Sequence, residues 1–274
     1  MSHNSGPTEH PGHPHLAYQN EQFLNTPDAR TLRILAEYLE PQSRLRRENI
    51  QDTIVFFGSA RIHSRESAGS EEAALAMARY YDDARELSRR LTEWAMALPR
   101  KRRRFIVTSG GGPGIMEAAN RGAHEAGGRA MGLNIRLPFE QNPNEYISPE
   151  LNFEFHYFFM RKFWFAYLAK ALVAFPGGFG TLDELMEILT LAQTQKLNKK
   201  MVILLYGRRY WEEIVNFPAL VKWGMISPED LDLFHFADSP TEAFDQLTRE
   251  LDHLYLKPSA PVEEETPAIA KTRG

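Results

Sequence analysis

Two adjacent carboxylates follow a glycine-rich turn in the stretch AFPGGFGTLDELMEIL, residues 174–189. Glycines at the start of a helix leave free backbone N–H groups, which together with the helix dipole can bind an anion. Asp183 and Glu184 lie only a few residues beyond this turn. A carboxylate beside an anion can act as a general base or stabilise a developing positive charge. These residue types therefore indicate chemistry on an anionic substrate.

The same residues also fit a purely structural role. Thr181 and Glu184 have the S/T-x-x-E spacing of a capping box, in which Glu184 would only satisfy a backbone N–H group. Asp183 would then favour the positive end of the helix dipole and nothing more. Adjacent residues of a helix point about 100° apart, so the two carboxylates cannot share one role. On spacing alone, the capping-box interpretation is the favoured one.

Small residues follow three expected strands, in GSAR (58–61), GGGPG (110–114) and PGGFG (176–180). Ligands of open α/β sheets bind outside the carboxyl ends of the strands, so turns at one edge would form a single crevice. None of the turns contains the G-x-G-x-x-G or P-loop pattern, which disfavours NAD, FAD and P-loop chemistry. A mononucleotide phosphate remains as the favoured anion. The alternative is that the glycines only let a helix pack tightly on a strand.

An aromatic stretch, FEFHYFFMRKFWFAY (153–167), precedes the last of these turns. Such a stretch is typical of a core helix or a subunit interface. Arg161 and Lys162 lie in its middle, and a cation in apolar surroundings is costly unless it meets an anion. We therefore expect Arg161 to meet a substrate phosphate or a catalytic carboxylate.

Apolar segments alternate with amphipathic ones along the chain. The expected strands are 52–60, 104–114, 129–135, 170–175 and 200–206. The expected helices are 26–41, 71–98, 115–128, 159–169, 181–195, 208–224 and 242–255. Strands separated by helices pair in parallel through right-handed crossovers. The pattern predicts an α/β fold: one doubly wound, Rossmann-like parallel sheet with a helical N-terminal extension. The expected boundaries are a disordered tail (1–20), the extension (21–50), the domain (51–256) and a second disordered tail (257–274).

Composition excludes several functional classes. The chain has no cysteine, which rules out disulfides, thiolate metal sites and cysteine nucleophiles. Histidines in the first 20 residues lack the spacing of a metal site, so no metal is expected. A net charge of −4 from 32 basic and 36 acidic residues gives no bias toward nucleic acid, and the basic run 99–105 is interpreted as a solvated loop. Neither a secretory signal nor an apolar run of about 18 residues is visible, so we expect a cytoplasmic protein with no membrane partner.

Three motifs together resemble those of the LOG ("lonely guy") family. They are SGGGPGIMEAANRGAHEAGG (109–128), MRK (160–162) and PGGFGTLDE (176–184), and the resemblance covers roughly residues 50–225. The family pattern is PGGxGTxxE preceded by an Arg-Lys pair, and every fixed position is met here. Where plant-type members read M-H-x before the pair, this chain reads F-F-M, which resembles the longer bacterial members. The sequence shows no motif for a pyridoxal phosphate site.

The resemblance implies the roles of individual residues. Members of the family are cytokinin riboside 5′-monophosphate phosphoribohydrolases and related nucleotide hydrolases, some of them called AMP nucleosidases. By resemblance, Arg161 and Glu184 are catalytic. A neighbouring arginine favours the charged form of a carboxyl group, so we also expect Arg161 to keep Glu184 ionised at neutral pH. The substrate-binding positions are Ser59, Gly110, Gly111, Gly112, Gly114, Lys162, Gly177, Gly178, Gly180 and Thr181.

The implied function is hydrolysis of a nucleoside 5′-monophosphate, AMP or a cytokinin riboside monophosphate, to free base and ribose 5-phosphate without a cofactor. LOG-like folds also include non-catalytic nucleotide-binding proteins and carriers of the molybdenum cofactor, which form the alternative class. A third interpretation is an assembly whose N-terminal extension recruits a partner. The resemblance also implies a homodimer or a multiple of it, with the helix 159–169 at or near the contact.

Overall fold

The computed structural model describes residues 16–67, 72–99, 102–138, 142–197 and 199–257. The chain divides into two compact units, Met1–Ser43 and Arg44–Gly274. The first unit holds the short helices η1 (Ala17–Gln19), α1 (Glu21–Leu24) and η2 (Pro27–Ala29), and α2 (Arg30–Arg47) begins there. Of the two expected tails, residues 1–15 and 258–274 lie outside the described residues.

The second unit is built on a seven-stranded sheet with the order β4-β3-β2-β1-β5-β6-β7. Every pairing in it is parallel. The strands are β1 (Thr53–Phe57), β2 (Ile106–Ser109), β3 (Ala130–Ile135), β4 (Asn152–Phe155), β5 (Ala169–Ala174), β6 (Val202–Tyr206) and β7 (His235–Ala237). The expected α/β fold with a doubly wound parallel sheet is confirmed.

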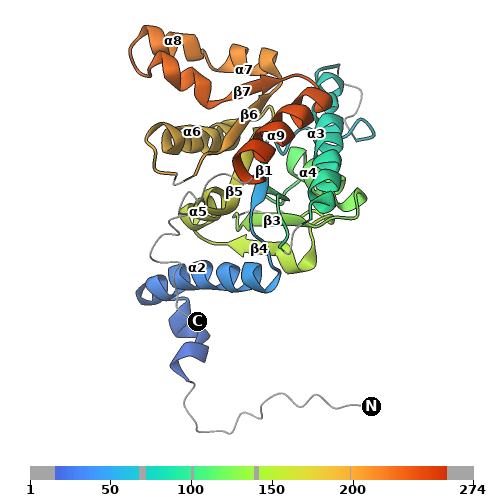
Figure 1. Cartoon of the computed structure of the whole chain (residues 1–274). Helices are drawn as coiled ribbons and strands as arrows, with labels where there is room; N and C mark the ends of the chain where they lie inside the picture. The colour runs from blue at the N-terminus through green and yellow to red at the C-terminus, as the bar shows by residue number, and fades with distance from the viewer. Residues whose placement is uncertain (1–15, 68–71, 100–101, 139–141, 198, 258–274) are drawn as a thin grey trace. The chain divides into compact units, whose positions relative to one another are not determined.

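Helices cover both faces of this sheet, as Figure 1 shows. α3 (Glu72–Ala97), α4 (Ile115–Glu125) and α9 (Pro240–Tyr255) lie on one side, and α5 (Phe158–Leu168) and α6 (Phe179–Gln193) lie on the other. The remaining helical segments are η3 (Pro149–Leu151), α7 (Arg208–Ile214), α8 (Phe217–Lys222) and η4 (Pro228–Leu233). Because both faces are covered, all five residues of β1 and of β6 are buried, as expected for central parallel strands.

Two expected helices differ from the structure. The helix expected at 26–41 does not end at Pro41, because α2 continues to Arg47. An internal proline costs about 3 kcal/mol. Burial of Leu45 offsets part of that cost, and so does Arg44, which donates to the Asn152 carbonyl (2.8 Å). The helix expected at 208–224 is two helices.

The break between α7 and α8 has a local cause. The Asn216 side chain accepts the Ala219 N–H and caps α8, and Pro218 in the first turn of α8 lacks the N–H group that a continuous helix would need there. Sequence analysis also missed β4 and β7, which have only four and three residues and therefore carry a weak pattern. Among the described residues, none of the helices has the length and apolar character needed to cross a bilayer.

A buried ion pair lies at the amino-terminal edge of the sheet. Asp52, which is fully buried, accepts hydrogen bonds from Arg104 Nε (2.7 Å) and from the Phe105 N–H (2.7 Å). Arg104 Nη2 lies 2.6 Å from the same carboxylate. The pair joins the residue before β1 to the segment that leads into β2.

Replacing Asp52 by Ala should lower the free energy of unfolding by about 3–5 kcal/mol, because it leaves the Arg104 charge buried without its partner. The matched control is Asp82→Ala, which breaks the exposed Arg65–Asp82 pair (3.0 Å) and should cost less than about 1 kcal/mol. Urea denaturation of both variants measures the difference. Equal, small losses would show that the Asp52 pair contributes no more than a surface pair.

Candidate functional site

The three glycine turns follow β1, β2 and β5, which are neighbours in the sheet. Chain order reverses between β1 and β5, and this switch point is where open α/β sheets bind ligands. Hydrogen bonds join the turns directly: the Ser59 N–H donates to the Pro176 carbonyl (3.0 Å), and the Ile115 N–H donates to the Ser59 carbonyl (3.1 Å). The structure therefore brings the three turns together at one edge.

At two positions only glycine fits, because a Cβ atom would clash with neighbouring atoms. A Cβ atom on Gly114, whose φ is +72°, would lie 2.4 Å from the Ser59 carbonyl oxygen. A Cβ atom on Gly177 would lie 2.1 Å from Thr181 Oγ1. Gly178 and Gly180 differ, because a Cβ atom there would meet nothing within 4 Å. The beginning of α6 thus faces open space on the side of these two glycines.

Both helices that follow the glycine turns begin without a side-chain cap. Gly114 is the N-cap of α4 and Gly178 is the N-cap of α6, and neither helix receives a capping side-chain hydrogen bond. Thr181 is a buried residue inside α6 and not its N-cap. The capping-box interpretation of Thr181 and Glu184 is therefore wrong. The first turn of an uncapped helix keeps N–H groups that can donate hydrogen bonds to an anion.

Glu184 pairs with Arg161 instead. Arg161 Nη2 donates to Glu184 Oε1 at 2.7 Å, and their side chains are only 11% and 13% exposed. Lys162 is the next residue of α5, and its Nζ atom lies 2.7 Å from Asp183 Oδ2 and 2.9 Å from Glu187 Oε2, both on α6. Two parallel sets of ion pairs therefore connect α5 to α6, with the Arg161–Glu184 pair in the more buried position.

The Arg161 guanidinium also lies close to the second glycine turn. A Cβ atom on Gly110 would be 3.7 Å from Arg161 Nη1. The rings of Phe158 and Phe165 have their centroids 5.3 and 5.5 Å from its Cζ atom. Arg161 Nε is buried and finds no hydrogen-bond partner within the described part of the chain. One guanidinium thus spans from the turn after β2 to the carboxylate on α6.

Burial raises the pKa of Glu184 to about 7, although Arg161 and Lys162 both act to lower it. Repulsion from Asp183 and Glu187 raises it further. The expectation that Arg161 keeps Glu184 fully ionised at neutral pH is therefore wrong, because desolvation outweighs the attraction. Near neutral pH, Glu184 exchanges a proton readily, which suits a general base.

Other candidate residues lie in the glycine turns or bind them. Ser59 Oγ accepts the Arg61 N–H (3.0 Å) in the first turn. Two residues that sequence analysis missed contact the glycine turns: Asn144, in the loop before η3, and Tyr210, on α7. Each is separated by about 33 residues in the sequence from the glycine it contacts, so no local sequence pattern could reveal it. Among the described residues, no group of three or more His, Asp or Glu side chains could hold a metal ion.

The chain is similar in sequence to a family of known proteins. A family model described as "Possible lysine decarboxylase" matches residues 116–247. The cytokinin riboside 5′-monophosphate phosphoribohydrolase LOG5 of Arabidopsis thaliana is 30% identical over 171 residues, which cover 61% of this chain and 70% of that protein. A probable enzyme of the same activity, LOG4 of Oryza sativa subsp. japonica, is 30% identical over 145 residues, which cover 52% of this chain and 62% of that protein.

Among solved structures, the molybdenum cofactor carrier protein MCP of Chlamydomonas reinhardtii is 21% identical, with a TM-score of 0.48. That alignment covers 73% of this chain and 98% of the carrier. The chain spans 50–62% of the length of the first three curated relatives that it matches. LOG5, at 30% identity, is matched over more than two thirds of its length. The chain therefore belongs to the LOG family.

Proposed function

We propose that this protein hydrolyses the N-glycosidic bond of nucleoside 5′-monophosphates and releases the free base and ribose 5-phosphate. One observation carries the proposal: Arg161 binds the Glu184 carboxyl group at 2.7 Å and also lies close to Gly110, in the glycine turn that leads into the uncapped helix α4. The relatives named as phosphoribohydrolases support the reaction type. The substrate base is adenine or an isopentenylated relative of it.

In the proposed reaction, N–H groups of the glycine turns bind the 5′-phosphate. The ribose then extends toward α6, with C1′ next to Glu184. The C1′–N bond breaks as a water molecule attacks C1′, and positive charge develops on the sugar, as in glycoside hydrolysis. Glu184 accepts the water proton and stabilises that charge, and the departing base takes up a proton. Arg161 orients the carboxylate throughout.

The first prediction concerns the 5′-phosphate. The purified protein should release adenine from AMP, or isopentenyladenine from isopentenyladenosine monophosphate, and it should barely act on the matching nucleosides. Binding energy from the phosphate aligns the glycosidic bond, so its loss should lower kcat/KM strongly. Chromatography of a panel of nucleotides and nucleosides measures both rates.

Equal rates with and without the phosphate would contradict the role given to the glycine turns. Tight nucleotide binding with no base released from any nucleotide would instead favour the alternative function, a non-catalytic nucleotide or molybdenum cofactor carrier. Retention of both Arg161 and Glu184, in contact with one another, favours the enzyme over that alternative.

Glu184→Gln should lower kcat about a hundredfold or more and leave the Kd for AMP largely unchanged, because the carboxylate acts on charge that exists only in the transition state. In the wild type, kcat/KM should rise with pH, about tenfold per unit below pH 7, and level off above it. The sign follows from the pKa of Glu184, about 7, since only the ionised form accepts a proton. Rates measured between pH 5 and 9 test this.

The matched control is Asp183→Asn, which removes the neighbouring carboxylate on α6. Asp183 is 60% exposed and pairs with Lys162, so its loss should change kcat far less. Because Asp183 helps to raise the pKa of Glu184, the midpoint of the pH profile should move to lower pH while its shape is kept. Near wild-type turnover in Glu184→Gln would show that Glu184 is not a catalytic residue.

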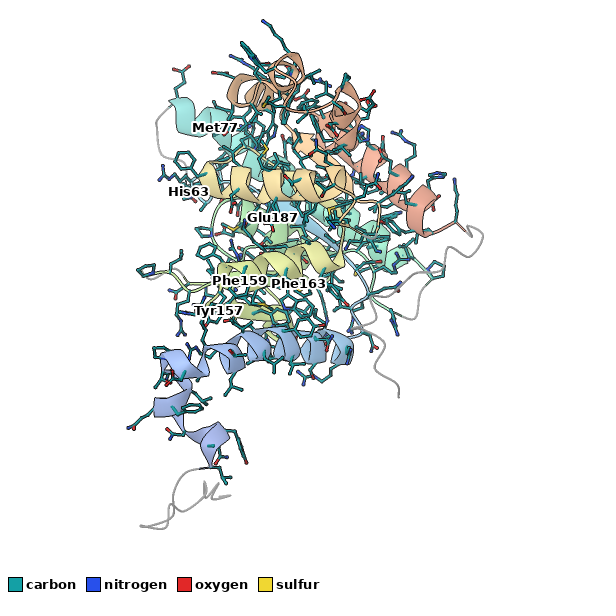
Figure 2. All side chains as sticks on the ribbon, turned by 90° about the vertical axis from the view of Figure 1, so that its left-hand side faces the viewer. His63, Met77, Tyr157, Phe159, Phe163 and Glu187 are labelled. Atoms are coloured by element: carbon teal, nitrogen blue, oxygen red, sulfur yellow. The ribbon has the colours of Figure 1, made fainter. Side chains whose placement is uncertain are left out.

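We also propose that the protein assembles as a homodimer through α5 and the start of α6. Phe158 and Phe159 are about half exposed, Phe163 is 37% exposed, and Phe179 is 93% exposed. Figure 2 shows α5 and α6 side by side, with Phe159 and Phe163 on the surface toward the viewer. Exposed aromatic rings of this kind are typical of a protein–protein interface. Arg161 would then lie close to the dimer contact.

Phe163→Glu should shift the wild-type dimer toward monomer and lower activity, because it places a charge in a desolvated contact. The control is Trp223→Glu at the end of α8, which alters a more exposed ring on another element and should leave the dimer intact. Light scattering after size exclusion gives the mass of each variant. A wild-type protein that is fully active as a monomer at micromolar concentration would refute the dimer.

A further inference from the structure

In the glycine turns after β2 and β5, backbone carbonyl groups accept hydrogen bonds from side chains of other elements. On α7, the Tyr210 hydroxyl donates to the Gly177 carbonyl at 2.8 Å. In the loop before η3, Asn144 Nδ2 donates to the carbonyls of Gly111 and Gly112, at 3.0 Å each. The Asn144 N–H donates to the Gly111 carbonyl as well, at 2.8 Å. The carbonyl groups of each of these two turns are thus fixed by a residue outside the turn.

Asn144 is itself fixed in the core. Its Nδ2 atom also donates to Asn120 Oδ1 (3.0 Å), and Asn120 is a fully buried residue of α4. Ser109, the last residue of β2, donates its hydroxyl to the same oxygen (2.7 Å) and accepts the Gly111 N–H (3.1 Å). The turn after β2 is therefore bound to α4 through three polar side chains.

Holding a carbonyl group also orients the next N–H group. In a planar trans peptide the two groups point in opposite directions. With the Gly177 carbonyl bound to Tyr210, the Gly178 N–H points to the other side of the turn, and the Gly111 carbonyl fixes the Gly112 N–H in the same way. Within the described part of the chain, neither of these N–H groups donates to a backbone carbonyl. Both are therefore available to a ligand.

We propose that Asn144 and Tyr210 are positioning residues for the nucleotide phosphate. By binding the turn carbonyls they keep these negative dipole ends away from the phosphate and keep the N–H groups of Gly112 and Gly178 directed at it. A turn without this support would also populate the flipped peptide, whose carbonyl oxygen repels an anion. The inference rests on the proposed function for the identity of the anion, a 5′-phosphate, but it concerns binding and not the bond that breaks.

Tyr210→Phe is the direct test, because it removes one hydroxyl group and keeps the ring. Isothermal titration should show inorganic phosphate and AMP binding about fivefold to tenfold more weakly, the effect of one lost hydrogen bond. The Kd for adenosine, which lacks the phosphate, should stay unchanged. In turnover assays KM for AMP should rise by the same factor, with kcat much less affected.

The matched control is Tyr255→Phe. The Tyr255 hydroxyl also donates to a backbone carbonyl, that of Lys200, but Lys200 precedes β6 and lies at the opposite edge of the sheet. Loss of this hydroxyl should leave phosphate and AMP binding unchanged. Asn144→Ala removes both side-chain bonds to the second turn and should weaken phosphate binding by about tenfold or more. Thermal melting of each variant confirms that it is folded.

The outcomes separate this proposal from the proposed function. A wild-type protein that binds phosphate but releases no base, with Tyr210→Phe binding it more weakly, would support positioning and overturn the hydrolysis. Wild-type phosphate affinity in folded Tyr210→Phe, or an equal loss of adenosine affinity, would overturn the positioning role. A wild-type protein that binds neither phosphate nor AMP would overturn it as well.

Discussion

The ion pair between Arg161 and Glu184 is the interaction on which the rest of the site depends. It is nearly buried, and removing one partner of such a pair leaves a charge that the protein cannot solvate. The pair fixes α5 against α6 and holds the carboxylate near the glycine turns, because Arg161 also lies close to Gly110. Burial raises the pKa of Glu184 to about 7 against the attraction of Arg161, so the packing around the pair tunes the carboxyl group.

Sheet order imposes the second constraint. Because β2, β1 and β5 are adjacent and parallel, the turns that follow them must meet at one edge. The glycines permit the close approach, and the polar side chains of Asn144 and Tyr210 hold the turn carbonyls. Stability and function are divided between the two edges, since the buried Asp52–Arg104 pair lies at the opposite edge from the turns.

The fold and the glycine turns could be predicted from sequence because both depend on local patterns: apolar strands, amphipathic helices and glycine after a strand. Contacts across the fold could not. The T-x-x-E spacing fits a capping box equally well, and only the start of α6 at Phe179 shows that Thr181 is not the cap. The pKa of Glu184 depends on how deeply α5 and α6 bury it, which no motif records. Asn144 and Tyr210 reach the turns only through the tertiary fold.

The central claim is that the turns hold the phosphate while Glu184 faces the glycosidic bond. A crystal structure of Glu184→Gln with AMP bound tests it most directly, because glutamine matches glutamate in size, its amide oxygen can still accept from Arg161, and the variant should not consume its ligand. The account predicts the phosphate within hydrogen-bond distance of the N–H groups of Gly112 and Gly178, with ribose C1′ next to residue 184. A phosphate bound away from these turns, or C1′ directed away from residue 184, would contradict it.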